Sequence, residues 1–383
     1  MGSIRKRCPH RWLTLSRGPR MNASVRLRAI GMALLAPLIA VVVAVLATTL
    51  VIAAAGSSPG DFWAAMFSNP LPRIRVNIVN QTAMIYIAAV SAAIGFRMGL
   101  FNIGVEGQYT IASFAAASFA GAAFLGGFLN VVAALVVAVV VGAAWAGIAG
   151  ILKTTRGVSE VISTIMLNAI AVTLVGYLLN RYGVHEGNTV HTEKLPDSSR
   201  LDGFSPYLPR DGQVWALVIL AVLLGVGFWV LLTKTRFGFD LRASGQSETA
   251  AVASGIDPKR MIVVAMLLSG GVAGLIWMPA LFGGAGSYGT SFQVGLGFTG
   301  LGVALLGRNQ PLGMLFGAVL FAFLTAQSNT LTFSTDISPS IVQITQGVAV
   351  LAVVVAYEVV RRWRSRLEQR VVASELEPTG AAV

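Results

Sequence analysis

Ten apolar stretches run along this chain, and they restrict its fold more than any single motif does. Several approach or exceed the ~20 residues that a helix needs to cross the hydrocarbon of a bilayer. Helices are expected because lipid offers no partner to free backbone groups. We place the spans at residues 30–55, 79–96, 109–127, 130–152, 161–180, 213–232, 261–281, 294–307, 312–326 and 341–357. The predicted fold is an all-α, polytopic transmembrane bundle of about ten spans.

Composition and charge agree with this interpretation. Only 11% of the residues are charged, against ~25% in soluble domains. The net charge of +12 could indicate nucleic acid, but the basic residues flank the spans and no nucleic-acid-binding motif accompanies them. With ten spans, most of the 28 lysines and arginines fall on one side. Both termini are therefore expected in the cytoplasm, by the positive-inside rule.

The same topology divides the chain into three parts. Residues 1–29 form a basic cytoplasmic tail, residues 30–357 the transmembrane domain, and residues 358–383 a second cytoplasmic tail. The loop over 181–212 would be external, either as an ordered cap or as a solvated loop. The loop over 233–260 would be cytoplasmic, and its pattern predicts a short helix, a turn and a second short helix. Ser247 suits the start of that second helix and Gly255 its end.

Motifs for several kinds of chemistry are missing from the sequence. The three histidines and the single cysteine, Cys8, make no plausible zinc set. No lysine completes a phosphate-binding loop, and no GxSxG elbow is present. We therefore predict a transport or channel protein that is not an enzyme and has no metal or cofactor of its own.

Polar residues inside the spans indicate a candidate substrate path. The segment 99–108, GLFNIGVEGQ, interrupts the apolar chain with glycines, amides and a carboxylate. Such groups persist in lipid where they are buried in protein or line a wet path. Uncharged amides suit a neutral solute with hydrogen-bonding groups better than an ion. The candidate residues are Asn102, Glu106, Gln108, Asn168, Gln343 and Gln346. The alternative role is interhelical hydrogen bonding.

Two further patterns belong to this path. The second and tenth spans carry amides and a hydroxyl that we expect at its external mouth, namely Asn77, Asn80, Gln81, Gln343, Thr345 and Gln346. Glycine-rich breaks at 99–108, 283–289 and 295–302 place one broken region in each half of the chain. Matching breaks suggest an inverted repeat around a central site, although no residue-level repeat supports it.

Four segments, taken in order, carry a family resemblance. They are 99–108 (GLFNIGVEGQ), 158–168 (VSEVISTIMLN), 235–256 and 303–313 (VALLGRNQPLG). Together they resemble the membrane permease subunits of ATP-binding-cassette (ABC) importers, and most of all the branch of simple-sugar and nucleoside permeases.

The resemblance implies a function and a set of partners. The chain would import nucleosides by alternating access, with simple sugars such as ribose or galactose as the alternative cargo. A separate ATPase subunit would bind ATP, a second permease would complete a heterodimer, and an external lipoprotein would deliver substrate. The location would be the cytoplasmic membrane of a prokaryote. The competing classes are a channel or ATP-independent carrier, and a membrane-embedded scaffold or enzyme.

The inner loop is similar to the EAA-x3-G segment through which such permeases dock on their ATPase. Here it reads TAAVASG over 249–255, so threonine replaces the glutamate and Glu248 stands one position earlier. The resemblance assigns ATPase coupling to Leu241, Arg242, Gly245, Ala250, Ala251 and Gly255.

Overall fold

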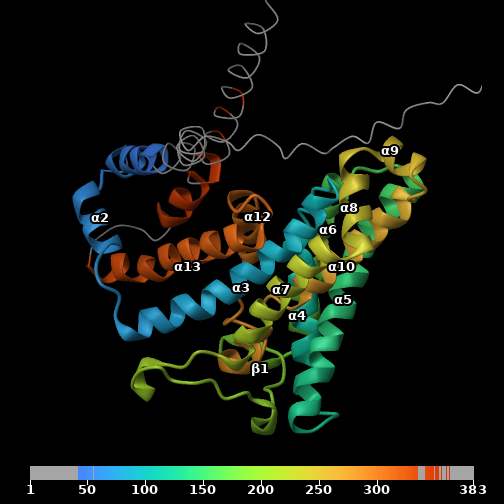
Figure 1. Ribbon diagram of the computed structural model, residues 1–383. Coiled ribbons are helices and arrows are strands. Elements are labelled where there is room, and N and C mark those ends of the chain that lie inside the picture. The colour runs from blue at the N-terminus through green and yellow to red at the C-terminus, as the bar shows by residue number, and fades with distance from the viewer. Residues whose placement is uncertain are drawn as a thin grey trace, which may run out of the picture.

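The computed structural model describes residues 42–54, 56–334, 341–348 and 350–352, with single positions at 355, 359 and 362. These residues form an all-α bundle with one small β-hairpin, as Figure 1 shows. The predicted fold class is therefore confirmed. The tail over 1–29 and the start of the first predicted span lie outside the described residues, as does nearly all of the tail over 358–383.

A helix lies at every predicted span. In chain order they are Val42–Ala54, α3 (Pro72–Arg97), α4 (Val105–Gly121), α5 (Gly127–Arg156), α6 (Glu160–Tyr182), α7 (Ile219–Lys234), α10 (Pro258–Gly274), α12 (Leu296–Leu306), α13 (Pro311–Ser334) and Ile341–Ala352. Six described helical stretches are long and apolar enough to cross a membrane: α3, α5, α6, α7 with its preceding turn, α10 with its extension, and α13. The others are shorter, and α4 carries Glu106 and Gln108 in its first turn.

Shorter elements join these helices. They are α2 (Pro59–Met66), β1 (Val184–Glu186), β2 (Thr189–His191), η1 (Asp197–Ser199), η2 (Pro209–Asp211), η3 (Ala216–Val218), α8 (Arg236–Gln246), α9 (Glu248–Ala253), α11 (Met278–Ala280) and the π-helical turn η4 (Leu281–Ala285). The helix α2 and the hairpin were not predicted from the sequence.

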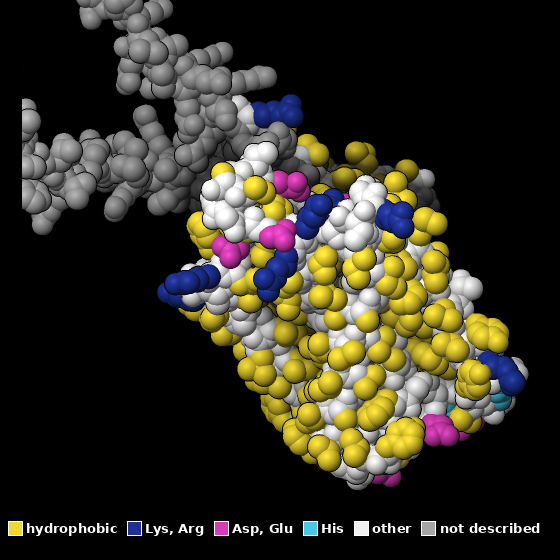
Figure 2. Space-filling model, turned by 90° about the vertical axis from the view of Figure 1, so that its right-hand side faces the viewer, with side chains coloured by type: hydrophobic (Ala, Val, Ile, Leu, Met, Phe, Trp, Pro, Cys, Tyr) yellow, Lys and Arg dark blue, Asp and Glu magenta, His cyan; other side chains and the backbone are white. Residues whose placement is uncertain are grey.

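The helices form two packed groups (Figure 1). The larger group contains α4, α5, α6, α7 and α10, and α3 runs from it toward α13. A second, smaller core joins α2 to α13 and to the helix Ile341–Ala352, through Phe62, Met66 and Leu324 among others. Figure 2 shows an almost continuous apolar surface over the middle of the molecule, with charged side chains gathered at its ends. This distribution is that of a multi-pass membrane protein.

The loop over 181–212 is ordered. After the hairpin, the backbone N–H of Thr192 donates to Tyr288 O, that of Leu195 to Gly286 O, and that of Leu201 to Phe282 O. The loop is thus fastened to the segment that follows α10. On its exposed side, Lys194 Nζ lies 2.9 Å from Glu186 Oε1, and this ammonium lowers the pKa of that carboxyl.

Glycines let α5 and α10 approach closely. A Cβ added at Gly270 would overlap the carbonyl oxygen of Gly142, and one added at Gly274 would overlap Ala138 O. Such contacts drive helix association in lipid, where burial of apolar surface provides little force.

Gly270→Leu should therefore push α5 and α10 apart, because the nearest obstacle is backbone and cannot rotate away. We expect the free energy of unfolding to fall by about 1–3 kcal/mol, seen as a lower thermal midpoint of the purified protein in detergent. Gly176→Leu on α6 is the control, since no atom lies within 4 Å of an added Cβ there. Equal midpoints for the two variants would contradict this packing.

Candidate functional site

The segment 99–108 turns the chain between α3 and α4. The helix α3 ends at Arg97, and Gly99 adopts φ +77°, a left-handed conformation that glycine accepts at little cost. The backbone N–H of Leu100 then donates to Gly95 O at 3.0 Å. The irregular backbone is therefore closed by bonds within the protein, as lipid requires.

Asn102 and Gln108 form a reciprocal amide pair inside this turn. Asn102 Nδ2 donates to Gln108 Oε1 at 3.0 Å, and Gln108 Nε2 donates to Asn102 Oδ1 at 2.9 Å. Asn102 also donates to Ser269 Oγ of α10 at 2.8 Å and accepts from the N–H of Gly104. Both amides are buried. Their hydrogen-bonding capacity is spent on the protein itself.

Asn168 of α6 fastens the same turn from the other side. Its Nδ2 donates to Ile103 O, and its Oδ1 accepts from the N–H of Gly107, both at 2.9 Å. A Cβ at Gly107 would lie 2.7 Å from Asn168 Oδ1, so glycine is needed for this approach. The neighbouring carboxylate, Glu160, accepts from Lys153 Nζ at 2.6 Å.

Glu106 connects the first glycine break to the second. Its Oε1 accepts from the N–H of Gly295 at 2.6 Å, and its Oε2 accepts from the N–H of Gly297 at 2.8 Å. These are free donors at the start of α12, where the helix dipole also favours a negative charge. The buried carboxylate is thus a cap supplied by a distant part of the chain.

The structure therefore separates the six candidate path residues into two places. Asn102, Glu106, Gln108 and Asn168 hold helices together, while Gln343 and Gln346 lie on the helix Ile341–Ala352. The first four show the contacts that interhelical hydrogen bonding predicts.

Gln343 and Gln346 line a cavity of about 810 Å³. Its walls come from α3, from α12 and the segment that leads into it, from α13 and from the helix Ile341–Ala352. The lining residues are Gln81, Ile85, Gln293, Val294, Gly295, Leu296, Phe298, Thr299, Gly302, Phe321, Thr325, Ser328, Val342, Gln343, Gln346, Gly347, Val350 and Leu351. No charged side chain lines the described part of this cavity.

The amides expected at the external mouth differ in their surroundings. Gln81 and Gln343 lie in the cavity, and Gln346 Nε2 donates to Thr325 Oγ1 of α13 at 2.8 Å. Asn80 instead donates to Gln213 O and accepts from the N–H of Trp215, both at 3.0 Å. Thr345 donates to Ile341 O in its own helix.

Gln293 and Phe298 were missed as candidates. Both line the cavity. The sequence places Phe298 in the glycine-rich break over 295–302, and no pattern singles out Gln293 just before it. Their contribution depends on how α12 is set against α3, which periodicity does not reveal.

The inner loop folds as the sequence predicts. It forms α8 and α9, Ser247 Oγ accepts from the N–H of Ala250, and Gly255 adopts φ +78° after the second helix. Leu241 and Ala251 are buried, whereas Ala250 and Gly255 are exposed. Arg242 is half-buried, and its Nε donates to Gly238 O at 3.1 Å.

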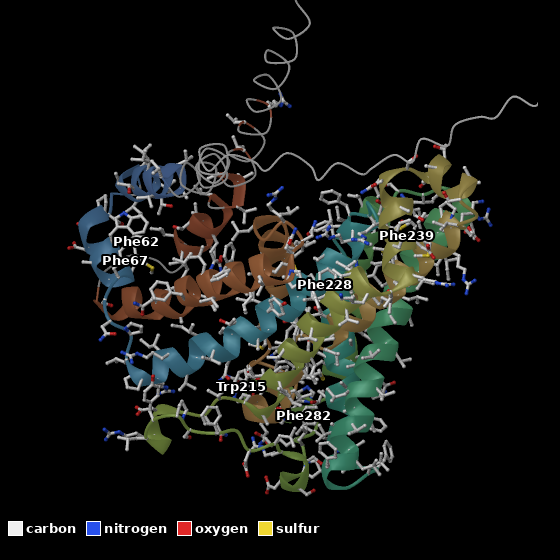
Figure 3. The ribbon with its side chains drawn as sticks, in the orientation of Figure 1. Phe62, Phe67, Trp215, Phe228, Phe239 and Phe282 are labelled. Carbon is white, nitrogen blue, oxygen red and sulfur yellow. The ribbon has the colours of Figure 1, made fainter. Side chains whose placement is uncertain are left out.

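Gly245 joins this loop to the turn after α3. A Cβ at Gly245 would lie 2.6 Å from Arg97 O and 2.7 Å from the carbonyl carbon of Met98. The six coupling candidates thus include residues that face the bundle and residues that face outward. Two exposed apolar side chains of this loop were missed as candidates, Phe239 and Val252. Phe239, labelled in Figure 3, belongs to α8.

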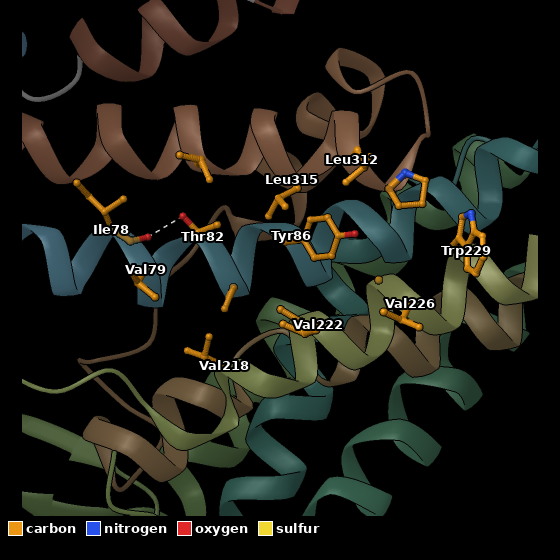
Figure 4. Close-up of a pocket in the computed structure, with 15 residues that line it drawn as sticks. Ile78, Val79, Thr82, Tyr86, Val218, Val222, Val226, Trp229, Leu312 and Leu315 are labelled. Carbon is orange, nitrogen blue, oxygen red and sulfur yellow. Dashed lines mark hydrogen bonds between the residues drawn. The ribbon is translucent and has the colours of Figure 1, made fainter. Parts of the chain in front are cut away.

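A second cavity, of about 600 Å³, lies between α3, α7 and α13 (Figure 4). It is almost wholly apolar, with Val222, Trp229 and Leu315 in its walls. The hydroxyl of Thr82 donates to Ile78 O of its own helix, so it offers no free donor to this space. Across the described residues, no group of three or more His, Cys, Asp or Glu side chains could hold a metal ion.

Comparison with known proteins decides the family. The model of the branched-chain amino acid transport system / permease component family matches residues 74–356. The chain belongs to this permease family. The match spans α3 to the last described helix and includes the cavity, the 99–108 turn and the inner loop.

Individual relatives align with this chain over most of its length. The guanosine ABC transporter permease protein NupP of Bacillus subtilis (strain 168) is 31% identical, over 85% of this chain and 94% of the relative. The nucleoside ABC transporter permease protein NupB of Lactococcus lactis subsp. cremoris (strain MG1363) is 30% identical, over 84% and 91%. The glucose ABC transporter permease protein TsgB13 of Haloferax volcanii is 27% identical, over 86% and 88%. The predicted resemblance to ABC permeases is confirmed, and the chain is a multi-pass protein of the cell membrane.

Glu106→Gln should loosen the start of α12. The amide keeps one acceptor oxygen but turns an NH₂ toward the second backbone N–H, which would cost about 1–3 kcal/mol. We expect faster hydrogen exchange at 295–299 and impaired transport, with membrane insertion kept. Glu193→Gln, at an exposed position in the loop over 181–212, is the matched control. Unchanged exchange at 295–299 would contradict the capping role.

Proposed function

We propose that this chain is the permease subunit of an ABC importer for nucleosides, driven by ATP hydrolysis on a separate subunit. The observation that carries the proposal is the uncharged, amide- and hydroxyl-lined cavity between α3, α12, α13 and the helix Ile341–Ala352. Amides and hydroxyls both donate and accept hydrogen bonds, which suits a neutral solute. The nucleoside relatives NupP and NupB support the choice of cargo.

A simple sugar is the less favoured cargo. The glucose relative TsgB13 is 27% identical, below the two nucleoside relatives. The amides of this cavity can bond to either cargo, but the exposed ring of Phe298 also allows a flat base to stack face to face.

The proposed partners are a cassette ATPase, a second permease and an external binding lipoprotein. The ATPase would dock on α8 and α9, where Phe239 and Val252 are exposed. A second permease is supported by relatives that come in twos within an organism. Lactococcus lactis has the nucleoside permease proteins NupB and NupC, and Bacillus subtilis has the guanosine permease proteins NupP and NupQ. The chain itself would perform no catalysis, and it would form a heterodimer within the bilayer.

Uptake by the reconstituted importer tests the cargo. Vesicles holding the chain with its ATPase, second permease and binding protein should accumulate labelled uridine or adenosine only when ATP is supplied. Excess unlabelled nucleoside should abolish accumulation, and excess ribose should leave it almost unchanged. Competition by ribose as strong as by nucleoside would favour the sugar instead. Accumulation without ATP or the ATPase would indicate a carrier.

Gly245→Val tests the coupling loop. The added side chain would collide with the backbone after α3 and shift α8, so ATP-driven uptake should fall several-fold while the ATPase still co-purifies. Gln246→Ala, at the adjacent exposed position, is the control and should transport normally. Normal uptake by Gly245→Val would show that this contact does not transmit the ATPase movement.

A further inference from the structure

Two amide side chains in the polar cavity have polar atoms without a hydrogen-bond partner among the described residues. Gln81 is only 5% exposed, and it makes no hydrogen bond to any described residue. The Oε1 atom of Gln293 is also buried without a partner among those residues. Burying an amide oxygen without a partner is unfavourable, so Gln293 Oε1 calls for a physical explanation. The unpaired Gln81 amide lines the same cavity, where it is free to bind a solute.

Neighbouring amides show that the fold satisfies such groups elsewhere. Asn80, one residue before Gln81 on α3, bonds to Gln213 and Trp215. Asn102 and Gln108 bond to each other. Among the described residues, amide oxygens of Asn130, Asn309 and Gln327 are also buried without a partner. None of these three lines the polar cavity, whereas Gln81 and Gln293 do, and there an incoming solute can supply the missing partners.

Contacts with α4 hold the segment of the cavity wall that carries Gln293 in place. Its backbone carbonyl accepts from the hydroxyl of Tyr109. The ring of Phe292 stacks on Tyr109 with centroids 4.8 Å apart and planes inclined by 22°. Two residues beyond Gln293, the N–H of Gly295 is bound by Glu106. A binding group held in this way loses little entropy when a ligand arrives.

An aromatic ring is available in the same cavity. Phe298, in the first turn of α12, is 50% exposed and lines the space with Gln81 and Gln293. Any of the heterocyclic bases can stack on such a ring, because every base has a flat π face. Stacking is not available to a sugar ring in the same form, so this side chain favours a solute with a base.

We propose that Gln81 and Gln293 bind the edge of the nucleobase while Phe298 stacks on its face. A carboxamide presents an acceptor next to a donor, which matches a base edge with a donor beside an acceptor; glutamine reads adenine in this way in DNA. The inference rests on the proposed function, and it makes Gln81 and Gln293 specificity-determining residues for that cargo.

Thiol protection tests this assignment without the binding protein. Cys8 is the only cysteine, so Cys8→Ser followed by Gly347→Cys gives one thiol in the cavity. An added Cβ at Gly347 meets no atom within 4 Å. The rate of its alkylation by a maleimide would be measured on the assembled permease and ATPase complex in nanodiscs, against uridine, cytidine, adenosine, guanosine and ribose. Gly126→Cys on the exposed loop before α5 is the control thiol and should show no protection.

We expect at least one nucleoside to slow alkylation, and Gln81→Leu to raise the protecting concentration about tenfold. Ribose should protect the thiol only weakly, and to the same extent in the Gln81→Leu variant as in the protein that keeps Gln81. Thr82→Val, on the next residue but facing the apolar cavity, should behave like the unsubstituted protein. Gln293→Leu should raise the protecting concentration in the same way. It replaces Gln81→Leu in the test if that variant does not fold.

Failure of this inference can be separated from failure of the proposed function. Suppose that the importer accumulates nucleosides. If Gln81→Leu and Gln293→Leu then leave protection by nucleosides unchanged, or weaken protection by ribose as much as protection by nucleosides, the base-binding role is overturned while the proposed function stands. Nucleoside uptake without any protection of the Gly347→Cys thiol would also overturn the base-binding role, because the cargo would then bind outside this cavity. If no nucleoside is accumulated, the proposed function itself fails.

Discussion

The bond between the Glu106 carboxylate and the start of α12 is the interaction on which the rest of the structure depends. Lipid offers no partner to free backbone groups, yet this chain breaks its helices near both 99–108 and 293–297. Glu106 follows the first break and satisfies two N–H groups at the second. Asn102, Gln108 and Asn168 then close the first break against α10 and α6. One wall of the polar cavity is set by these contacts.

The same turn also reaches the inner loop. Gly99 and Gly245 lie in backbone contact, so a movement of α8 meets the end of α3 directly. Arg97 at that end donates to Asn309 O of the turn before α13. The helices α3 and α13 both line the cavity. A continuous set of contacts therefore runs from the surface proposed for ATPase docking to the cavity proposed for the cargo.

Sequence patterns predicted the helices better than they predicted the site. Apolar length and helix-ending residues located every described span, and Ser247 and Gly255 located α8 and α9, because these signals are local. The hairpin over 184–191 was missed since its strands are three residues each. Gln81 and Gln343 were assigned to one mouth, but Gln293 and Phe298 were not, because their place depends on long-range packing. The sequence also could not show that Asn102 and Gln108 satisfy each other.

The central claim is that cargo passes through the cavity lined by Gln81, Gln293 and Phe298, while the 99–108 network supports its wall. A cryo-electron microscopy structure of the complete importer, trapped with nucleoside and a non-hydrolysable ATP analogue, tests it most directly. The account predicts density for the base against Phe298, within hydrogen-bond distance of Gln81, and an intact bond between Glu106 and Gly295. Nucleoside density against Asn102 or Asn168 would contradict it, if the bonds of Asn102 to Gln108, or those of Asn168 to Ile103 and Gly107, were broken.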